Sequence, residues 1–394
     1  MTKDVPVADS TRLIHTAAEE SARLPAKTVG PAIQRGSTVL MDRAADLYAH
    51  GKITYGRDGL AAHHALIAGL KDLEHAEHVE LYGSGLGAVT GAMLSVLKAG
   101  DEVLVVDGAY KPTRRFCDNF LKNYGVSVRY FPSDARPDEV LALITERTRL
   151  IALESPASLS FEMMDVGAVA AGARERGVLT LMDNTWAAGL YFRPLDHGID
   201  LSVQALTKYV GGHADVFLGS AATRNPVVAR KLAQTTLNLG HSVGPEEAYL
   251  ALRGLRTLPA RLAAHGANGL KVAKWLMGRT EVARVRHPAL PHDPGHALWK
   301  RDFSGCCGLF AFELAPPAGL AETLAFLDAL KLFGLGFSWG GYESLALYCD
   351  PQVKEARTAK PWTAAGPLIR LHVGLEDPAD LIADLEAGFA AIKP

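Results

Sequence analysis

Two residues of opposite charge end consecutive apolar runs in the sequence. Asp183 follows "VLTLM", and Lys208 lies near the end of "LSVQALTKYV". A primary amine in apolar surroundings is costly to protonate, so its pKa falls and a neutral base or nucleophile becomes available near neutral pH. A carboxylate just beyond a buried strand lies where open α/β sheets bind their ligands. We therefore expect both side chains to face one crevice.

A glycine-rich turn, "YGSGLGAVTG", follows the apolar run "HVELY" and precedes a helical pattern. Backbone N–H groups at the start of a helix can bind a phosphate group. Gly83, Gly85 and Ala88 also match the GxGxxA pattern of dinucleotide-binding turns, and Asp107 ends the next predicted strand, where a ribose-binding carboxylate would lie. A nicotinamide-dependent dehydrogenase is therefore one interpretation of the turn.

The other interpretation takes the lysine, the carboxylate and the turn together, because pyridoxal phosphate needs all three. Lys208 would bind the aldehyde covalently, Asp183 would keep the pyridine nitrogen protonated, and the turn would hold the phosphate. The apolar residues around Lys208 argue against an ordinary surface lysine, which would keep its ammonium group in water.

Apolar runs rich in β-branched residues alternate with helical patterns from about residue 61 onwards. Strands are predicted at 78–82, 101–108, 126–131, 149–156, 178–184 and near 201–206, and helices at 59–75, 87–100, 137–146 and 166–177. This order predicts a large three-layer α/β/α domain with a mostly parallel sheet. Helical patterns at 261–278 and 318–333 and strand patterns at 304–314 and 368–377 predict a smaller C-terminal α/β domain.

The predicted domain boundaries are an N-terminal arm at 1–60, a large domain at 61–255 and a small domain at 256–394. The arm consists of short polar and proline-bearing pieces without sustained periodicity. Such a segment needs another surface to pack on, and this predicts an oligomer.

The overall charge is close to neutral, with 41 basic and 43 acidic residues. It provides no electrostatic basis for binding nucleic acid or an anionic membrane, so a small molecule is the expected partner. The beginning of the chain lacks the apolar core of a signal peptide, and no apolar run is long enough to span a membrane. We expect a cytoplasmic location.

The remaining metal-ligand and thiol residues do not predict a metal site. Cys117, Cys306, Cys307 and Cys349 have no CxxC spacing, which favours reduced core residues. Four histidines and two glutamates near the glycine turn have the residue types of zinc ligands, but they fall on a helix that runs out into polar surface. These are His63, His64, His75, His78, Glu74 and Glu77.

Several motifs in a fixed order resemble the Cys/Met-metabolism family of pyridoxal phosphate enzymes, which includes cystathionine β-lyase, γ-lyase and γ-synthase. The resemblance covers nearly the whole chain from about residue 10. The motifs are "TYGRDG", "LYGSGLGAV", "DGAYKPTRRF", "ESPAS", "LMDNTW", "QALTKYVGGHADVFLGS", "SWGGYESL" and "IRLHVGLED". The resemblance implies the aspartate-aminotransferase-like (type I) fold and a homotetramer built as a dimer of dimers.

The resemblance also implies roles for individual residues in binding the cofactor. Lys208 resembles the lysine that binds the aldehyde, and Asp183 the partner of the pyridine nitrogen. Tyr110 resembles the tyrosine that stacks on the ring and helps to activate the substrate amine. Gly85, Leu86 and Thr207 resemble the phosphate contacts within the subunit, and Tyr55 and Arg57 resemble a pair that reaches the phosphate of the neighbouring subunit.

Three further residues resemble substrate contacts. Arg370 corresponds to the arginine that holds the α-carboxylate, a task that suits a planar, permanently charged guanidinium. Ser338 and Trp339 of "SWGG" resemble a segment that contacts the substrate. With Lys208 and Tyr110 as the catalytic pair, they complete the expected site.

The residue at position 205 departs from many family members, which have a serine where this chain has Ala205. One phosphate hydroxyl is therefore expected to be missing. Together with "SWGG" and "RLHVGLED", this alanine resembles the bacterial β-lyase branch. The branch implies β-elimination of L-cystathionine to homocysteine, pyruvate and ammonia, a transsulfuration step of methionine biosynthesis.

Three alternatives remain open at this point. A γ-lyase or γ-synthase of the same family would release 2-oxobutyrate or transfer a thioether. A nicotinamide-dependent dehydrogenase would not need Lys208. A binding protein that kept the fold without the chemistry is disfavoured, because the lysine, aspartate and arginine positions are all filled.

Overall fold

The computed structural model describes residues 7–15, 28–49 and 51–392. The larger of its two sheets has seven strands in the order β1-β7-β6-β5-β4-β2-β3. The strands are β1 (His78–Tyr82), β2 (Glu102–Val106), β3 (Ser127–Phe131), β4 (Thr148–Glu154), β5 (Leu179–Asp183), β6 (Leu201–Gln204) and β7 (Gly219–Thr223). Strands β3, β2, β4, β5 and β6 pair in parallel, and this confirms the predicted mostly parallel sheet.

Strand β7 was not predicted, and it is antiparallel to both of its neighbours, β1 and β6. Its sequence, "GSAAT", lacks the large β-branched and aromatic residues that mark strands. All five of its residues are buried. The small side chains allow α3 (Gly85–Val96) to contact this part of the sheet.

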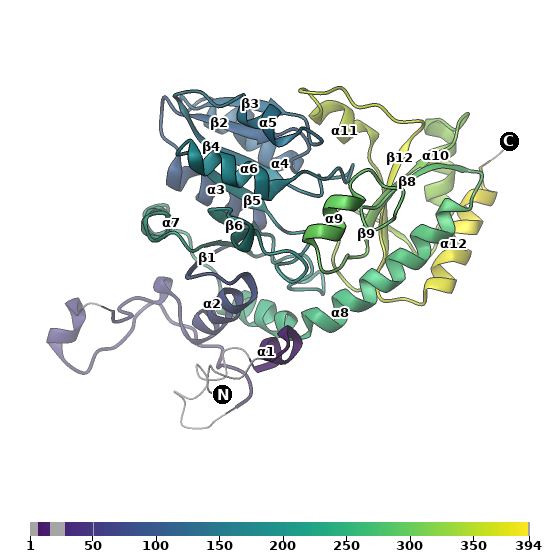
Figure 1. Cartoon of the computed structure of the whole chain (residues 1–394). Coiled ribbons are helices and arrows are strands. Elements are labelled where there is room, and N and C mark those ends of the chain that lie inside the picture. The colour runs from purple at the N-terminus through teal and green to yellow at the C-terminus, as the bar shows by residue number, and fades with distance from the viewer. Residues whose placement is uncertain (1–6, 16–27, 50, 393–394) are drawn as a thin grey trace.

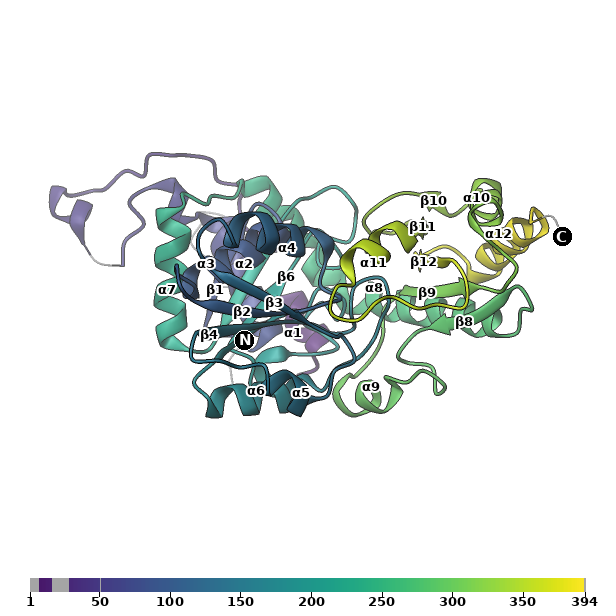
Figure 2. The ribbon, with the colours of Figure 1, turned by 90° about the horizontal axis from the view of Figure 1, so that it is seen from above.

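Helices cover both faces of the large sheet, as the predicted three layers require. Helices α3 and α4 (Lys111–Arg115) lie on one face, and α5 (Pro137–Leu141) and α6 (Val166–Glu175) lie on the other (Figure 2). Helix α2 (Ala61–Glu74) buries an apolar stripe that includes Leu66, Leu70 and Leu73. The strands and helices α2, α3, α5 and α6 share one continuous hydrophobic core.

The smaller sheet has five strands in the order β10-β11-β12-β9-β8 and its own hydrophobic core. The strands are β8 (Val282–Arg286), β9 (Leu309–Leu314), β10 (Gly334–Leu335), β11 (Leu345–Tyr348) and β12 (Leu368–His372). The associated helices are α9 (His296–Asp302), α10 (Leu320–Ala329), α11 (Asp350–Ala356) and α12 (Pro378–Ala390). The predicted C-terminal α/β domain is confirmed.

Helix α8 (Pro245–Met277) is the longest helix and joins the two halves of the molecule (Figure 1). It contacts α1 (Asp9–His15) and α2 at one end and β8 and α12 at the other. The helix runs without interruption through residue 255, where the sequence predicts the boundary between the large and the small domain. The three predicted domain ranges stay a prediction.

The predicted arm includes α1, which packs on α8 and α2, and the described residues between α1 and α2, which extend away from the large sheet (Figures 1 and 2). It contains two short 3-10 helices, η2 (Ala44–Tyr48) and η3 (Gly56–Asp58). Leu40 and Tyr48 are 89% and 94% exposed. Residues 1–6, 16–27 and 50 of the predicted arm lie outside the described residues.

Between β6 and α8 the chain continues through α7 (Pro226–Asn238), which packs against α3. Asn225 caps this helix by accepting the backbone N–H groups of Val227 and Val228. Within the described residues, no helix is both long and apolar enough to cross a membrane.

Candidate active site

A cleft of about 260 Å³ lies between the carboxyl ends of the large-sheet strands and the small domain. Five of the predicted site residues line it, namely Tyr110, Lys208, Ser338, Trp339 and Arg370. They come from the loop after β2, the loop after β6, the segment between β10 and β11, and strand β12. The structure therefore brings the predicted catalytic and substrate residues together.

Lys208 follows β6 and is half-buried in this cleft. Its Nζ atom donates a hydrogen bond to Ser338 Oγ at 2.5 Å and lies 5.6 Å from the centre of the Trp339 ring. Burial, and then the positive charge of Arg370, lower the pKa of Lys208 from 10.5 to about 8. A useful fraction of the amine is consequently neutral near physiological pH.

Ser338 has a backbone φ of +79°, which is uncommon for a residue other than glycine. In this conformation its hydroxyl accepts from Lys208, and its carbonyl oxygen accepts from Arg370 Nη2 at 2.8 Å. Two residues further on, Gly340 lies against the backbone of Lys208. A Cβ atom at Gly340 would be only 2.9 Å from the Lys208 carbonyl carbon, so a glycine is needed there. The "SWGG" turn thus fixes the lysine segment against β12.

Arg370 lies on β12 and is buried. One of its donors, Nε, has no hydrogen-bond partner among the described residues. Burial lowers the pKa of Arg370, although an arginine stays charged at neutral pH. A buried, charged group with a free donor is suited to bind a carboxylate ligand by donating hydrogen bonds to it.

Asp183 ends β5 beside Glu154, which ends β4 in the same register. Asp183 Oδ1 accepts from the backbone N and the hydroxyl of Thr185 at 3.0 and 2.5 Å. Burial raises the pKa of Asp183, and the Thr185 hydrogen bonds and the Lys208 charge oppose that rise. Burial, and then the charge of Asp183, raise the pKa of Glu154 well above its ordinary range. A cationic ring nitrogen bound here would relieve the repulsion between the two acids.

Tyr110 precedes α4, and its backbone N–H donates to Glu154 Oε2 at 2.7 Å. The ring is 46% exposed and lines the cleft. Burial, and then the charges of Asp183 and Glu154, raise the pKa of the Tyr110 hydroxyl. The phenol is therefore protonated in the described site and can act as a proton donor.

The glycine turn lies next to the lysine segment. A Cβ atom at Gly85 would lie 2.8 Å from the Cα of Ala205, so only glycine allows this approach. Ser84 caps α3 by accepting the Gly87 N–H at 3.0 Å. Leu86 is in the first turn of this helix. A helix start next to a lysine segment matches the predicted phosphate cradle.

Thr207 and Ala205 flank Leu206 on the same loop. The Thr207 hydroxyl accepts the backbone N–H of Leu218 at 3.0 Å and lies 3.2 Å from the Leu218 carbonyl oxygen. Ala205 donates its backbone N–H to the Thr185 hydroxyl at 2.9 Å. The Thr185 hydroxyl thus links the lysine loop to Asp183. Position 205 has no side-chain oxygen, so the hydroxyl on this loop that lies next to Lys208 in the chain is that of Thr207.

Tyr55 and Arg57 are not among the residues that line the cleft. They flank Gly56 at the start of η3, where Tyr55 forms a bridge with Thr38. The Arg57 guanidinium lies 5.2 Å from the centre of the Tyr55 ring. The single chain does not bring this pair to its own Lys208, and its role across a subunit boundary stays a prediction.

The histidines that resemble zinc ligands bind other groups. His63 Nε2 lies 2.8 Å from the Val243 carbonyl oxygen, and His64 contacts Gly59. His75 pairs with Asp196 and His78 with Glu80. Glu74 is buried and accepts from Ser202 and Gln204. The described residues contain no group of three or more His, Cys, Asp or Glu side chains placed to hold a metal.

Asp107 is not available to bind a ribose, contrary to the dehydrogenase interpretation. Its carboxylate is fully buried and accepts from Arg114 and from backbone N–H groups of residues 358–360. A dinucleotide could reach it only by displacing these donors. All four cysteines are buried and unpaired, as expected for reduced core residues.

Three residues of the site had no predicted role. Glu154 belongs to the motif "ESPAS", and its place near the end of a predicted strand indicates that it lies beside Asp183. Thr185 follows Asp183 by two positions, which is the spacing at which a side chain can bond locally. His372 lies 3.1 Å from Gly340 N and 3.0 Å from Gly341 O through its Nε2 atom, and no sequence pattern connects these segments.

The donors in and beside the cleft fit pyridoxal phosphate. Lys208 lines the cleft and offers an amine of lowered pKa. Asp183, Gly85, Leu86 and Thr207 are not among the lining residues, but Asp183 and Glu154 offer buried carboxylates beside Lys208 and Tyr110, and the start of α3 offers backbone N–H groups beside the lysine loop. The unpartnered Nε of Arg370 leaves a place for the carboxylate of an amino acid.

Comparison with known proteins identifies the family. The model of the family described as "Cys/Met metabolism PLP-dependent enzyme" matches residues 10–390. A putative cystathionine β-lyase of Rhizobium johnstonii is 46% identical over 367 residues, with 92% of this chain and 91% of that protein covered. Cystathionine β-lyase MetC of Escherichia coli is 41% identical over 373 residues, with 92% and 94% covered.

A solved structure supports the same assignment. Cystathionine γ-synthase from Xanthomonas oryzae pv. oryzae, in complex with cystathionine, superposes with a TM-score of 0.91 at 31% identity and covers 98% of this chain and 99% of that one. The predicted type I fold and the dependence on pyridoxal phosphate are thereby confirmed. The chain belongs to the family of Cys/Met metabolism PLP-dependent enzymes.

Proposed function

We propose that the protein is a carbon–sulfur lyase that converts L-cystathionine and water to homocysteine, pyruvate and ammonia. The observation that carries the proposal is the single cleft in which Lys208 Nζ bonds to Ser338 Oγ beside the buried Arg370. The identities of 46% and 41% to proteins described as β-lyases support this choice within the family.

Bound pyridoxal phosphate supplies a ring that accepts the electron pair left when the α-proton of the substrate is removed. Arg370 holds the α-carboxylate through its planar guanidinium and so presents the α-carbon to the lysine. Lys208 Nζ removes the α-proton as a general base, while Ser338 Oγ keeps the amine in place. Asp183 holds the proton of the pyridine nitrogen.

The bond between the β-carbon and sulfur then breaks, and the electron pair leaves with the sulfur. Homocysteine departs as a thiolate that needs one proton, which Lys208 or the Tyr110 hydroxyl donates. Tyr110 is protonated because its pKa is raised by burial and by the nearby Asp183 and Glu154. Hydrolysis of the remaining three-carbon imine consumes the water and yields pyruvate and ammonia.

The distal part of cystathionine carries a second carboxylate, and the cleft has positive charge to receive it. Lys111 and Arg115 line the cleft in addition to Lys208 and Arg370. Lys111 pairs with Glu355 at 2.5 Å, whereas Arg115 is exposed. Arg115 is therefore the better donor for the distal carboxylate.

The test is to mix the holoenzyme with L-cystathionine and to identify the keto acid and the thiol. We expect pyruvate and homocysteine. Release of 2-oxobutyrate and cysteine would instead make the protein a γ-lyase. Lys208→Ala is the control, because it removes both the amine that binds the aldehyde and the base; it should bind the cofactor non-covalently without turnover, and full activity in this variant would refute the mechanism.

The proposed assembly is a homotetramer in which two subunits share each active site. Exposed apolar side chains of the arm, Leu40 and Tyr48, support contact with another surface. Mixing inactive Lys208→Ala subunits with Arg57→Ala subunits tests the sharing, because hybrid dimers would contain one intact site. Recovery of activity is the expected result, and its absence would contradict a shared site.

A cytoplasmic location is also proposed. The four buried, unpaired cysteines are compatible with a reducing compartment. A fractionation experiment that found the enzyme outside the cytoplasm would overturn this part of the proposal.

A further inference from the structure

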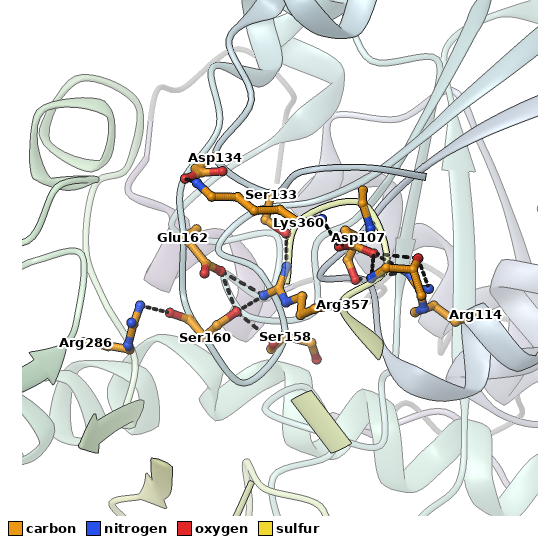
Figure 3. A network of polar contacts seen from close by, with 12 residues as sticks. Asp107, Arg114, Ser133, Asp134, Ser158, Ser160, Glu162, Arg286, Arg357 and Lys360 are labelled. Atoms are coloured by element: carbon orange, nitrogen blue, oxygen red, sulfur yellow. Dashed lines mark hydrogen bonds and ion pairs between the residues drawn. The ribbon is translucent and has the colours of Figure 1, made fainter. Parts of the chain in front are cut away.

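Four consecutive residues after α11, Arg357–Lys360, bind the large domain at two places (Figure 3). The first is the carboxylate of Asp107, which lies directly after β2 and three positions before Tyr110. Asp107 Oδ1 accepts the Thr358 N–H at 3.0 Å, and Oδ2 accepts the Ala359 and Lys360 N–H groups at 3.0 and 3.2 Å. Three successive backbone donors thus converge on one buried carboxylate.

Arg114 completes the surroundings of this carboxylate. Its Nη1 atom donates to Asp107 Oδ1 at 2.7 Å, and its Nη2 atom donates to the Thr358 hydroxyl at 2.9 Å. The guanidinium carbon lies 3.6 Å from the centre of the Tyr130 ring. Because Arg114 belongs to α4, which starts directly after Tyr110, it holds Asp107 and residue 358 to the helix that follows the catalytic loop.

At the second place, the Arg357 side chain reaches three residues of the large domain. It donates to the hydroxyls of Ser133 and Ser160 and pairs with Glu162 Oε2 at 2.9 Å (Figure 3). A Cβ atom at Gly108 would lie 2.7 Å from Arg357 Nη1, so the guanidinium rests against the loop backbone. Residues 107 and 108, three and two positions before Tyr110, are therefore in contact with the small domain.

The small domain also carries Ser338 and Arg370, the partners of Lys208 and of the α-carboxylate. Within the large domain, the backbone N–H of Tyr110 donates to Glu154, and its carbonyl oxygen accepts the N–H groups of Thr113 and Arg114 at 2.8 and 3.2 Å. These contacts tie the tyrosine to the large domain, and residues 357–360 tie the same loop to the small domain that carries Arg370.

We propose that Asp107 is a positioning residue that sets the place of Tyr110 relative to Arg370 by binding residues 358–360, an inference that rests on the proposed lyase function. Asp107 is not among the residues that line the cleft. Its effect on the reaction passes through Tyr110.

A double-mutant cycle on the holoenzyme separates positioning from stability. Asp107→Asn removes the charge and one acceptor oxygen, and we expect kcat on L-cystathionine to fall at least tenfold with less than a threefold change in KM. Tyr110→Phe lowers kcat on its own. If Asp107 acts through Tyr110, adding Asp107→Asn to Tyr110→Phe should lower kcat by less than threefold. Independent, multiplied losses would overturn the proposal.

Asp384→Asn is the matched control. Asp384 is also a buried carboxylate that accepts three successive backbone N–H groups, those of Lys331, Leu332 and Phe333, at 2.8, 2.9 and 3.1 Å. All of these partners lie within the small domain. This variant should lower the midpoint of thermal unfolding about as much as Asp107→Asn but leave kcat unchanged. An equal loss of kcat in both variants would show that Asp107 acts only on stability, and this would overturn the proposal.

Two further measurements keep the test decisive. If Asp107→Asn does not fold, Ala359→Pro removes one of the N–H donors at an exposed position and enters the same cycle with the same expected coupling. The products of the wild-type enzyme are identified in parallel. A keto acid other than pyruvate would revise the proposed function. The double-mutant cycle, measured as the release of that other keto acid, would still decide the role of Asp107.

Discussion

Lys208 Nζ lies 2.5 Å from Ser338 Oγ, although the two residues are 130 positions apart in the chain. The contact joins the large domain, which holds the reactive amine, to the small domain, which holds Arg370. The same serine also accepts from Arg370 through its carbonyl oxygen. One residue therefore fixes the base and the carboxylate-binding group relative to each other.

Ser338→Ala should lower kcat on L-cystathionine by about tenfold to a hundredfold. The change removes a hydrogen bond to a charged group, which contributes about 1.5–3 kcal/mol. Steady-state kinetics with pyruvate detection would measure the loss. Ser304→Ala is a control, because the Ser304 hydroxyl bonds to Tyr191 outside the cleft. Equal kinetics for wild type and Ser338→Ala would show that the contact has no role in turnover.

The rate at which cofactor-free protein combines with pyridoxal phosphate should rise with pH through a midpoint near 8. Only the neutral amine attacks the aldehyde, and the pKa of Lys208 is lowered from 10.5 to about 8. Arg370 contributes to that lowering, so Arg370→Met should move the midpoint upward. Stopped-flow absorbance between pH 6 and 11 would record both curves. A wild-type midpoint near that of a free lysine would contradict the assignment.

Arg115→Leu should raise KM for L-cystathionine by about tenfold, which corresponds to about 1.4 kcal/mol of binding free energy. The same variant should leave KM unchanged for S-methyl-L-cysteine, which lacks a distal carboxylate. Comparing both substrates in one assay separates a distal contact from general damage. Lys122→Leu removes an exposed charge elsewhere and should change neither value. A parallel rise in KM for both substrates would exclude the distal contact.

Glu74 should make the protein less stable as the pH rises from about 4.5 to 7. Burial raises the pKa of Glu74 from 4.5 to about 7, so the folded state binds the proton more tightly than the unfolded state. Its stabilisation is complete below pH 4.5 and is lost as the pH passes 7, with a total of about 3 kcal/mol.

Glu74→Gln should remove this part of the pH dependence, because an amide does not titrate. Urea unfolding at pH 5 and pH 8 would give the free energy of unfolding for both proteins. Glu146→Gln, at an exposed site, serves as the control. If the wild type and Glu74→Gln show the same change between the two pH values, the side chain is not protonated in the folded state.

Local signals in the sequence predicted the strand that ends at Asp183 and the strand that precedes Lys208, because both are continuous apolar runs. The resemblance to the family predicted that Tyr110, Ser338, Trp339 and Arg370 would join Lys208, and the cleft contains all five. Strand β7 was missed because its small residues have little strand propensity and its stability comes from neighbours.

The proposed role of Asp107 could not be predicted from the sequence, and the pattern around it also allowed the alternative interpretation as a ribose ligand. Its backbone donors lie about 250 positions further along the chain, at residues 358–360. Backbone N–H groups leave no mark in a sequence, since every residue except proline has one. A carboxylate that binds them looks the same as one that binds a ligand.

The positive φ of Ser338 has a consequence for how this position can vary. Glycine would adopt a φ of +79° without steric cost, so Ser338→Gly would remove backbone strain and, with it, the hydroxyl that holds Lys208. Selection for folding alone would favour glycine here, whereas selection for turnover would retain serine. A serine in a conformation suited to glycine is thus a trace of function that can be read from a single backbone angle.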